Sequence, residues 1–417
     1  MKKICRIRFY PNQSQIHCID GTLGCCRYIQ NKYIEYNTKS YEERNEFISG
    51  YDFSKMINKL KKNEPEYEWI SKYSTKAISD AILNEEKAYK KFFKTKKGYP
   101  KFKSRKKLTK ESFFFIKDNI HFDTKSEYII KIPILGNIRI LQKNQLPDIK
   151  SITSGRVIKD KNKYYVMFIY DCEPETIELR KNLHVGIDLG VKNYASIYLS
   201  DDISFTIHHY KDNPKYKEIK EKIIYYQQVI NYKQQINYGK LLNEYLDNHN
   251  GEEPSDKYKN IMKGKSYQTS RIRGLRKKIS RLYEKLNNIR IDFINKLVHN
   301  IVTRIKPQSI TIEDLKITEM LQNDNTSKLH ELLQESCLYL FRQKLIQKCS
   351  EYGIEVRLAN KFYASSKICS NCGNKKKDLK LSDRIYHCDC CGYEKDRDMN
   401  AAINLCNLKK KYYTIEI

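Results

Sequence analysis

The sequence has no long apolar segment. No run of eighteen apolar residues occurs in its 417 residues, and we find no signal peptide at its start, so neither a membrane span nor a secreted protein is expected. Internal repeats and low-complexity tracts are also absent. A chain of this length can form two or three domains, each with a sizeable core.

Acidic residues are scarce relative to basic ones. Asp and Glu total 50 against 79 Lys and Arg, which gives a formal net charge of +29. Such an excess disfavours self-association and attracts polyanions, because each cation placed on a phosphate releases a condensed counterion. We therefore expect a monomer that binds nucleic acid and no membrane. The 33 tyrosines and 15 phenylalanines offer stacking faces for unpaired bases, although most aromatic side chains in any chain are core.

Several catalytic arrangements are missing as well. The nine histidines lack metal-ligand spacing, and no Ser-His-Asp or Cys-His arrangement stands out. The thirteen cysteines would suit a disulfide framework only in a short secreted chain. Most of them are scattered, which indicates a reducing compartment, cytosolic or nuclear.

Four cysteines are regularly placed near the carboxyl end. Cys369 and Cys372 form one Cys-x-x-Cys-Gly motif, and Cys388 and Cys391 form another. Four thiolates at this spacing can surround one zinc ion, so the pattern predicts a zinc ribbon over residues 360–393. Cys390 is a competing ligand, but Cys391 keeps the standard spacing. The alternative is a set of unrelated buried thiols.

The amino-terminal part alternates between strand and helix patterns. Residues 2–10 predict a strand, and helices are expected over 13–37, 53–62 and 73–93, with a polar break at 37–45. From 112 to 169, short period-two segments predict strands of a small β-barrel, which the first strand joins across the helical insert. Basic residues follow the third helix and the segment after it. A solvated surface is the plain alternative, but the overall charge favours a phosphate-binding surface; its candidate residues are Lys72, Lys76, Lys101, Lys103 and Arg105.

Three distant segments each place a carboxylate at an element boundary. Asp188 lies in an apolar strand within 183–199, Glu313 ends a strand at 309–315, and Asp398 begins a helix that follows the second cysteine motif. A turn aspartate and unrelated surface acids are the alternatives. The order of elements matches a ribonuclease H-like layered α/β domain. If the three acids converge, they need cations, and two Mg²⁺ ions suit them.

The segments between these acids are expected to be largely helical. Residues 210–268 predict a helical or loop insertion, and 270–305 a long helix whose first turns are basic, with Arg271, Arg273 and Arg276 as candidate nucleic-acid contacts. A further helix over about 329–352 should end at Gly353, before a strand at 354–359.

The motifs together resemble TnpB, the transposon-encoded RNA-guided endonuclease family related to type V CRISPR effectors. The matching segments are GIDLGVKNYA at 186–195, IEDL at 312–315, and the cysteine motifs with DRDMNAAINL within 365–405. A looser match includes Arg27 and the segment GYPKFKS at 98–104. The resemblance covers nearly the whole chain except about 201–268.

This resemblance implies a RuvC-like nuclease with the triad Asp188, Glu313 and Asp398; Asp398 is preferred over Asp396 because it directly precedes Met399-Asn400. It also implies a guide RNA, a double-stranded DNA target with a short flanking motif, and a prokaryotic cytosol or nucleoid location. Base pairing would read the sequence. Arg27 and Lys367 join the candidate nucleic-acid contacts. The family's Gln-Gln near the flanking duplex is Ser79-Asp80 here, so the flanking-motif preference does not transfer.

The expected architecture is a multidomain α+β and α/β protein. A wedge-like β-barrel would comprise residues 1–10 and 103–180, a helical recognition insert 11–102, a RuvC-like domain 181–359 and 394–410, the zinc ribbon 360–393, and a tail 411–417. Three other readings stay open: a compact CRISPR effector that uses a CRISPR RNA, a non-cleaving RNA-guided repressor, and, less favoured, a transposase acting on its own DNA ends.

Overall fold

The computed structural model describes most of the chain in two compact units. It describes all residues except 1, 106–109, 119, 123–127, 142–145, 174–175, 315–334, 361–362, 381–382, 409–411 and 415–417. The units are Met1–Pro174 and Glu175–Ile417. Each has its own buried apolar clusters, so each is described separately.

The first unit contains a seven-stranded antiparallel sheet. Its strand order is β2-β6-β7-β1-β5-β4-β3. As expected, the amino-terminal strand β1 lies inside this sheet, between β7 and β5. The strands are β1 (Lys2–Tyr10), β2 (Lys110–Ile116), β3 (His121–Phe122), β4 (Ile129–Ile132), β5 (Gly136–Ile140), β6 (Ile152–Asp160) and β7 (Lys163–Asp171).

The expected closed barrel is wrong for the part of this unit that the structure describes. The edge strands β2 and β3 do not pair with each other there. Strand β3 has only two residues, too short for a continuous ladder. Strand β2 packs instead against two helices of the unit, and a covered edge needs no partner strand. The sheet is therefore open.

The described part of the first unit also contains three α-helices. They are α1 (Gln13–Arg44), α2 (Gly50–Asn63) and α3 (Thr75–Thr95), with a 3₁₀ segment η1 (Pro65–Lys72) before α3. Their core centres on Tyr33, whose ring lies 4.9 Å from that of Phe53 and 6.0 Å from that of Tyr89. The helical insert is thus a small aromatic-rich bundle.

The expected polar break at 37–45 does not exist, because α1 continues through it. Asn37 is buried, and its amide donates to the Tyr33 carbonyl (3.1 Å) and accepts from the Ile48 amide (2.9 Å). A buried polar side chain whose hydrogen bonds are satisfied costs little, so polar composition did not end the helix here.

The second unit is built on a six-stranded mixed sheet with the order β10-β9-β8-β11-β12-β15. Strands β8, β11 and β12 are parallel, while β9, β10 and β15 run antiparallel to their neighbours. Helices pack on the sheet around a shared apolar core. The strands are β8 (Arg180–Leu189), β9 (Asn193–Leu199), β10 (Ser204–His208), β11 (Pro307–Glu313), β12 (Glu355–Ala359) and β15 (Tyr412–Thr414).

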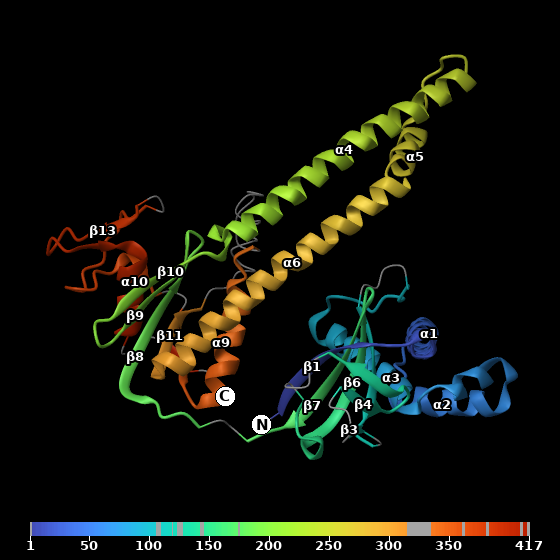
Figure 1. The fold of residues 1–417 in the computed structure, drawn as a ribbon, viewed down its shortest axis with the longest axis horizontal. Coiled ribbons are helices and arrows are strands. Elements are labelled where there is room, and N and C mark those ends of the chain that lie inside the picture. Colours follow the sequence, from blue (N-terminus) through green and yellow to red (C-terminus); the bar gives the residue numbers. More distant parts are fainter. Residues whose placement is uncertain are drawn as a thin grey trace. The chain divides into compact units, whose positions relative to one another are not determined.

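The region expected to be helix or loop forms a long helical arm. After a short 3₁₀ turn, η3 (Tyr210–Asp212), α4 (Pro214–Asn248) runs away from the sheet and α6 (Ser270–Asn300) returns beside it, with α5 (Asp256–Ser266) near the far end (Figure 1). A π-helical turn, η4 (Ile301–Ile305), leads from α6 into β11.

Two further helices are described in this unit. Helix α9 (Leu338–Tyr352) ends at Gly353, which has the expected left-handed conformation with φ of 69°; the start expected at about 329 lies outside the described residues. Helix α10 (Arg397–Cys406) follows the hairpin of β13 (Ile385–His387) and β14 (Glu394–Asp396), and η5 (Ser365–Lys367) precedes the first cysteine motif. None of the helices in the described part of the chain has the length and apolar character that a membrane span requires.

Candidate active site and metal centre

Two of the three predicted acids lie side by side at one edge of the second sheet. Ile187 of β8 pairs with Ile312 of β11 in parallel register, so the next residues, Asp188 and Glu313, both follow at the carboxyl ends of neighbouring strands. The chain then turns at Gly190, and Asp188 faces Ser196 across the β8–β9 hairpin. The expected strand hairpin at 183–199 is confirmed.

Helix α10 brings the third acid to the same edge. The helix lies directly on β8 at Gly186, where an added Cβ would stand only 2.1 Å from the Ala402 carbonyl oxygen and 2.4 Å from the Cys406 nitrogen. At the end of the helix, the Cys406 thiol is 3.2 Å from the His184 carbonyl oxygen. Because Gly186 has no side chain, α10 can lie against β8, and this contact determines the position of Asp398 in the first turn of the helix.

The neighbouring acid Asp396 has a different task. Its carboxylate accepts hydrogen bonds from the backbone N–H groups of Asp398 and Met399, each at 3.0 Å, and so caps α10. A capping carboxylate at a helix start is favoured by the free N–H groups there. Asp398 is thus left with its side chain beside Arg397, whose guanidinium lies 3.3 Å from it.

Asp188, Glu313 and Asp398 all line one cavity of about 410 Å³. The adjoining acid Asp314 does not line it and instead pairs with Arg342 of α9 at 2.7 Å. The cavity also carries a group of basic side chains around the acids: Lys192, Lys367, Lys380, Arg384 and Arg397. Such a cavity suits a polyanion. The basic side chains would attract it, and divalent ions would allow it to approach the carboxylates.

Two of these carboxylates, those of Asp188 and Glu313, have raised pKa values. Burial raises the pKa of Asp188 well above its ordinary value, and the nearby charges of Glu313 and Asp398 raise it further, whereas Arg397 lowers it. Burial also raises the pKa of Glu313, against the hydrogen bond that the Ser365 hydroxyl donates to its carboxylate. A bound cation would relieve both effects.

The three acids offer only oxygen ligands. Carboxylate oxygens are the ligands that Mg²⁺ prefers, whereas thiolates suit a softer metal. The donor set at this edge of the sheet is therefore compatible with divalent cations of the magnesium type.

The four predicted cysteines form a compact cluster. The Sγ atoms of Cys369, Cys372, Cys388 and Cys391 all lie within 4.8 Å of one another, with separations of 3.8 Å for Cys369–Cys391 and 3.5 Å for Cys372–Cys388. A tetrahedron with Zn–S bonds of about 2.3 Å has edges of about 3.8 Å. The cluster is therefore compatible with a zinc site, and the exposed Cys390 is not part of it.

The two cysteine motifs adopt the same turn. In the first, the Gly373 amide donates to the Cys369 carbonyl (2.9 Å), and in the second, the Gly392 amide donates to the Cys388 carbonyl (3.0 Å). Both glycines have positive φ, 77° and 69°, a conformation that other residues adopt at a cost. The glycines thus allow each pair of thiols to face the same point.

Two asparagines that the sequence reasoning missed tie α10 to the cysteine cluster. Asn404 donates to the carbonyls of Ser365 (2.8 Å) and Ile368 (2.7 Å). Asn400 also donates to the Ile368 carbonyl (2.7 Å) and accepts from the Ser370 amide (3.0 Å). Their spacing of four residues in an otherwise apolar helix is a signal that could have found them, since it puts both amides on one helix face.

Three of the candidate nucleic-acid contacts are engaged within the first unit. Arg27 forms an ion pair with Glu111 of β2, and Lys103 forms one with the buried Glu85 of α3. Arg105 is largely exposed and lies 3.6 Å from Asp20. The Arg27–Glu111 pair connects α1 with the sheet, and the Lys103–Glu85 pair connects the segment after α3 with that helix, so both cations already have a structural partner.

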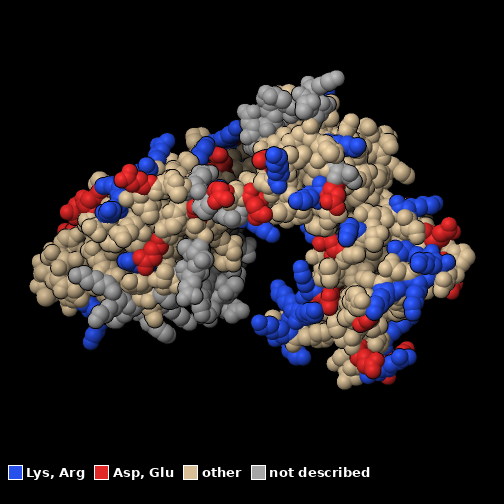
Figure 2. Space-filling model, turned by 90° about the horizontal axis from the view of Figure 1, so that it is seen from below, with Lys and Arg blue, Asp and Glu red and all other residues tan. Residues whose placement is uncertain are grey.

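The remaining candidates lie at the surface. Lys367 is half-buried and lines the acidic cavity, and Arg276 lies over the Tyr267 ring at 4.7 Å. In the view of Figure 2, several groups of lysine and arginine side chains lie at the surface, with fewer acidic side chains among them. The exposed candidates are Lys72, Lys76, Lys101, Arg271, Arg273 and Arg276.

Three family models match separate parts of the chain. A "Cas12f1-like, TNB domain" matches residues 339–405, a "Helix-turn-helix domain" of the IS605 OrfB type matches 1–46, and a "Probable transposase" model of the same type matches 252–324. The first covers the cysteine cluster and Asp398. Residues 2–44 form β1 and α1 here.

Curated proteins extend the match to nearly the full chain. A "Putative RNA-guided DNA endonuclease" from Streptomyces pristinaespiralis is 25% identical over 407 residues, 97% of this chain and 89% of that protein. "TnpB-like protein L79" from Acanthamoeba polyphaga mimivirus is 35% identical over 154 residues, 36% of this chain and 29% of that protein. These matches confirm the resemblance to TnpB-like proteins that the motifs predicted.

A solved structure gives a more distant likeness. The "mini-RNA-guided endonuclease CRISPR-Cas_phi3" aligns with 97% of this chain and 92% of its own, with a TM-score of 0.48 and 12% identity.

Proposed function

We propose that this protein is an RNA-guided DNA endonuclease that cleaves both strands of a target duplex at one RuvC-like site. One observation carries the proposal: Asp188, Glu313 and Asp398, from three distant segments, line a single cavity ringed by cations. The order and pairing of β8, β9 and β11 support a ribonuclease H-like domain. The names of the relatives supply the substrate class.

The three acids are proposed to hold two Mg²⁺ ions. When bound, such a pair activates the attacking water and stabilises the leaving 3′-oxygen. The chain's own residues prepare this site: the Ser365 hydroxyl holds one Glu313 oxygen, and Arg397 holds Asp398. Lys367, Lys380 and Arg384, which line the cavity, would bind the phosphates that flank the cleaved bond. No side-chain nucleophile is required.

The cysteine cluster is proposed to be the structural part of the same site. One zinc ion held by the four thiolates would fix the β13–β14 hairpin, which runs directly into α10. The hydrogen bonds of the α10 asparagines with residues 365–370 connect this helix with the cysteine cluster. Losing the zinc ion would therefore release Asp398 from its place, although no cysteine contacts the substrate.

The partners in this proposal are a guide RNA and a double-stranded DNA target. Base pairing would read the target, while exposed cations bind backbone; Arg271, Arg273 and Arg276 on the arm are candidates. We further propose that the protein acts as a monomer in a prokaryotic cytosol or nucleoid.

A compact CRISPR effector is the second candidate function. The match of residues 339–405 to the Cas12f1-like family model favours it. The two candidates share the cleavage chemistry and differ in the origin of the RNA. Sequencing the RNA that copurifies with the protein separates them, because a CRISPR RNA carries a repeat sequence and a transposon-end RNA does not.

The test of the function is guided cleavage by matched variants. The protein is purified with its RNA, a plasmid matching the recovered guide is supplied with a library of flanking sequences, and Mg²⁺ is added. Wild type should linearise the plasmid, and Asp188→Ala should bind RNA and plasmid equally but not cut. The control, Asp247→Ala, removes an exposed acid from α4 and should cut normally. Binding by wild type without any cutting would favour the repressor reading instead.

A further inference from the structure

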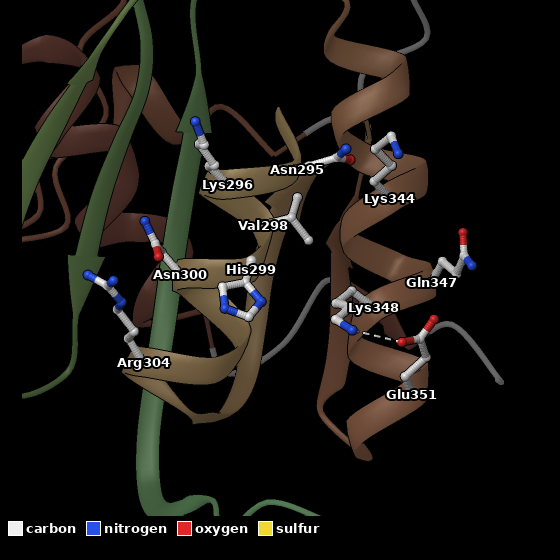
Figure 3. Close-up of a pocket in the computed structure, with 10 residues that line it drawn as sticks. All are labelled: Asn295, Lys296, Val298, His299, Asn300, Arg304, Lys344, Gln347, Lys348 and Glu351. Carbon is white, nitrogen blue, oxygen red and sulfur yellow. Dashed lines mark hydrogen bonds and ion pairs between the residues drawn. The ribbon is translucent and has the colours of Figure 1, made fainter. Parts of the chain in front are cut away.

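A second cavity lies in the same unit, between the carboxyl-terminal parts of α6 and α9. It has a volume of about 680 Å³, which is within the range of ligand pockets. Figure 3 shows that one wall comes from the end of α6 with the π-helical turn η4 and the other from α9. We call it the α6–α9 groove; its lining residues are Asn295, Lys296, Val298, His299, Asn300, Arg304, Lys344, Gln347, Lys348 and Glu351.

The groove is basic. Four lysines and arginines line it against one carboxylate, Glu351. Glu351 pairs with Lys348 at 2.9 Å, and Lys296 pairs with Asp292 at 2.7 Å, where both side chains are largely exposed. An exposed pair of this kind contributes little and exchanges readily. For Arg304 and Lys344, no acidic partner is found among the residues that the structure describes, so their charges remain available to an anion.

Polar side chains follow each wall at helical intervals. Lys296, Asn300 and Arg304 follow one another at intervals of four residues along α6 and η4, and Lys344 and Lys348 do so along α9 (Figure 3). Side chains at this interval stand about 6 Å apart, so Lys344 and Lys348 match the separation of successive phosphates along a strand, whereas the Asn300 amide stands between Lys296 and Arg304. The amides of Asn295 and Gln347 offer further donors and acceptors.

The groove is separate from the acidic cavity. Turn η4 leads into the amino end of β11 at Pro307, whereas Glu313 is at its carboxyl end. Six residue steps along a strand span about 20 Å. A nucleic acid in the α6–α9 groove would therefore contact this unit at the other end of β11 from the bond that is cut.

We infer that the α6–α9 groove binds the sugar–phosphate backbone of the guide RNA. This inference rests on the proposed function for the identity of the partner. The RNA is favoured over the DNA target because amides beside phosphate-binding cations can hydrogen-bond 2′-hydroxyl groups, which DNA lacks.

The test removes Arg304 and Lys344, which have no acidic partner in the described part of the chain. Arg304→Ala with Lys344→Ala is compared with wild type for binding of the RNA recovered from the wild-type complex, over a series of salt concentrations. If both cations contact phosphates, the slope of log K against log salt should fall by about 1.4–1.8, and binding at 0.15 M salt should weaken about 10- to 30-fold. A DNA copy of the RNA should show a smaller loss.

A control variant has the same net charge as the groove variant. Lys257→Ala with Lys263→Ala removes two exposed lysines from α5 and should leave RNA binding unchanged; an equal loss in the control would mean that only net charge matters. Unfolding temperatures check that both variants fold. If the groove variant binds RNA as tightly as wild type does, and wild type cleaves its target, this inference is overturned and the proposed function stays intact. If the groove variant binds RNA normally but its preassembled RNA complex binds DNA more weakly, the groove belongs to the DNA, and the inference is also overturned.

Discussion

Replacing Gly186 with alanine should displace the helix that carries Asp398. An added Cβ would stand 2.1 Å from the Ala402 carbonyl oxygen, and an ordinary contact requires about 3.4 Å, so α10 would have to recede by about 1.3 Å. Forcing one carbon into a packed interface costs about 1–3 kcal/mol. A displacement of about 1 Å at a catalytic group can slow a reaction about 100-fold.

The assay measures stability and cleavage together. For a unit of this size, each kcal/mol lowers the melting temperature by about 2–4 °C, so Gly186→Ala should melt several degrees lower. Single-turnover cleavage by the RNA-loaded variant should slow about 100-fold, with RNA affinity unchanged.

The matched control is Gly239→Ala in α4, where an added Cβ meets nothing within 4 Å. Alanine favours a helix over glycine by about 1 kcal/mol, so this variant should be as stable as wild type or more so, and cut normally. If Gly186→Ala has the same melting temperature as wild type and cleaves within threefold of the wild-type rate, the close packing of α10 on β8 does not position Asp398, and the reasoning is refuted.

Further predictions concern charge, metal and hydrogen bonds. Asp188→Asn should stabilise the metal-free protein by about 0.5–2 kcal/mol near neutral pH in a denaturant titration, because it removes a crowded buried charge; a loss of stability would contradict this. Since the folded-state pKa values of Asp188 and Glu313 are raised, the metal-free protein should lose stability as pH rises from their unfolded values, about 4, through the folded ones. Asp188→Asn should flatten that decline. Cys372→Ser should lower the zinc content measured by elemental analysis and slow cleavage, whereas Cys390→Ser should change neither. Asn404→Ala leaves the Ser365 carbonyl without this donor and the Ile368 carbonyl with Asn400 as its side-chain donor. The variant should lose about 1–3 kcal/mol of stability, seen as faster hydrogen exchange across 365–405. Unchanged exchange would show that Asn404 does not hold α10 to the cysteine cluster.

The sequence predicted the parts that depend on short-range pattern. The strand that carries Asp188, the glycine cap at Gly353 and the spacing within each cysteine motif are all set by residues within a few positions of one another, and all appear in the structure. Even the preference for Asp398 over Asp396 has a local cause, because Asp396 caps the helix. The sequence predicted the three acids from their positions at element boundaries and from the family resemblance, and in the structure all three line one cavity.

What the sequence missed depends on residues far apart in the chain. The helix α1 runs through Asn37 because the Ile48 amide and the Tyr33 carbonyl satisfy its side chain. Arg27 looked available for phosphate, but Glu111 lies beside it in the fold. In the described part of the first unit, the edge strands β2 and β3 do not close a barrel, because α1 and α3 pack against β2. A period-two sequence pattern predicts strands but not which helices cover them.

Local pattern thus determined which elements form, where the thiols and carboxylates stand along them, and that the surface is basic. Tertiary structure alone decided that α10 lies against Gly186, that Asn404 ties it to the cysteine hairpin, and that α6 and α9 enclose a basic groove. The physical reason is that propensity and periodicity act over a few residues, whereas close approach and charge pairing depend on which distant surfaces the fold brings into contact.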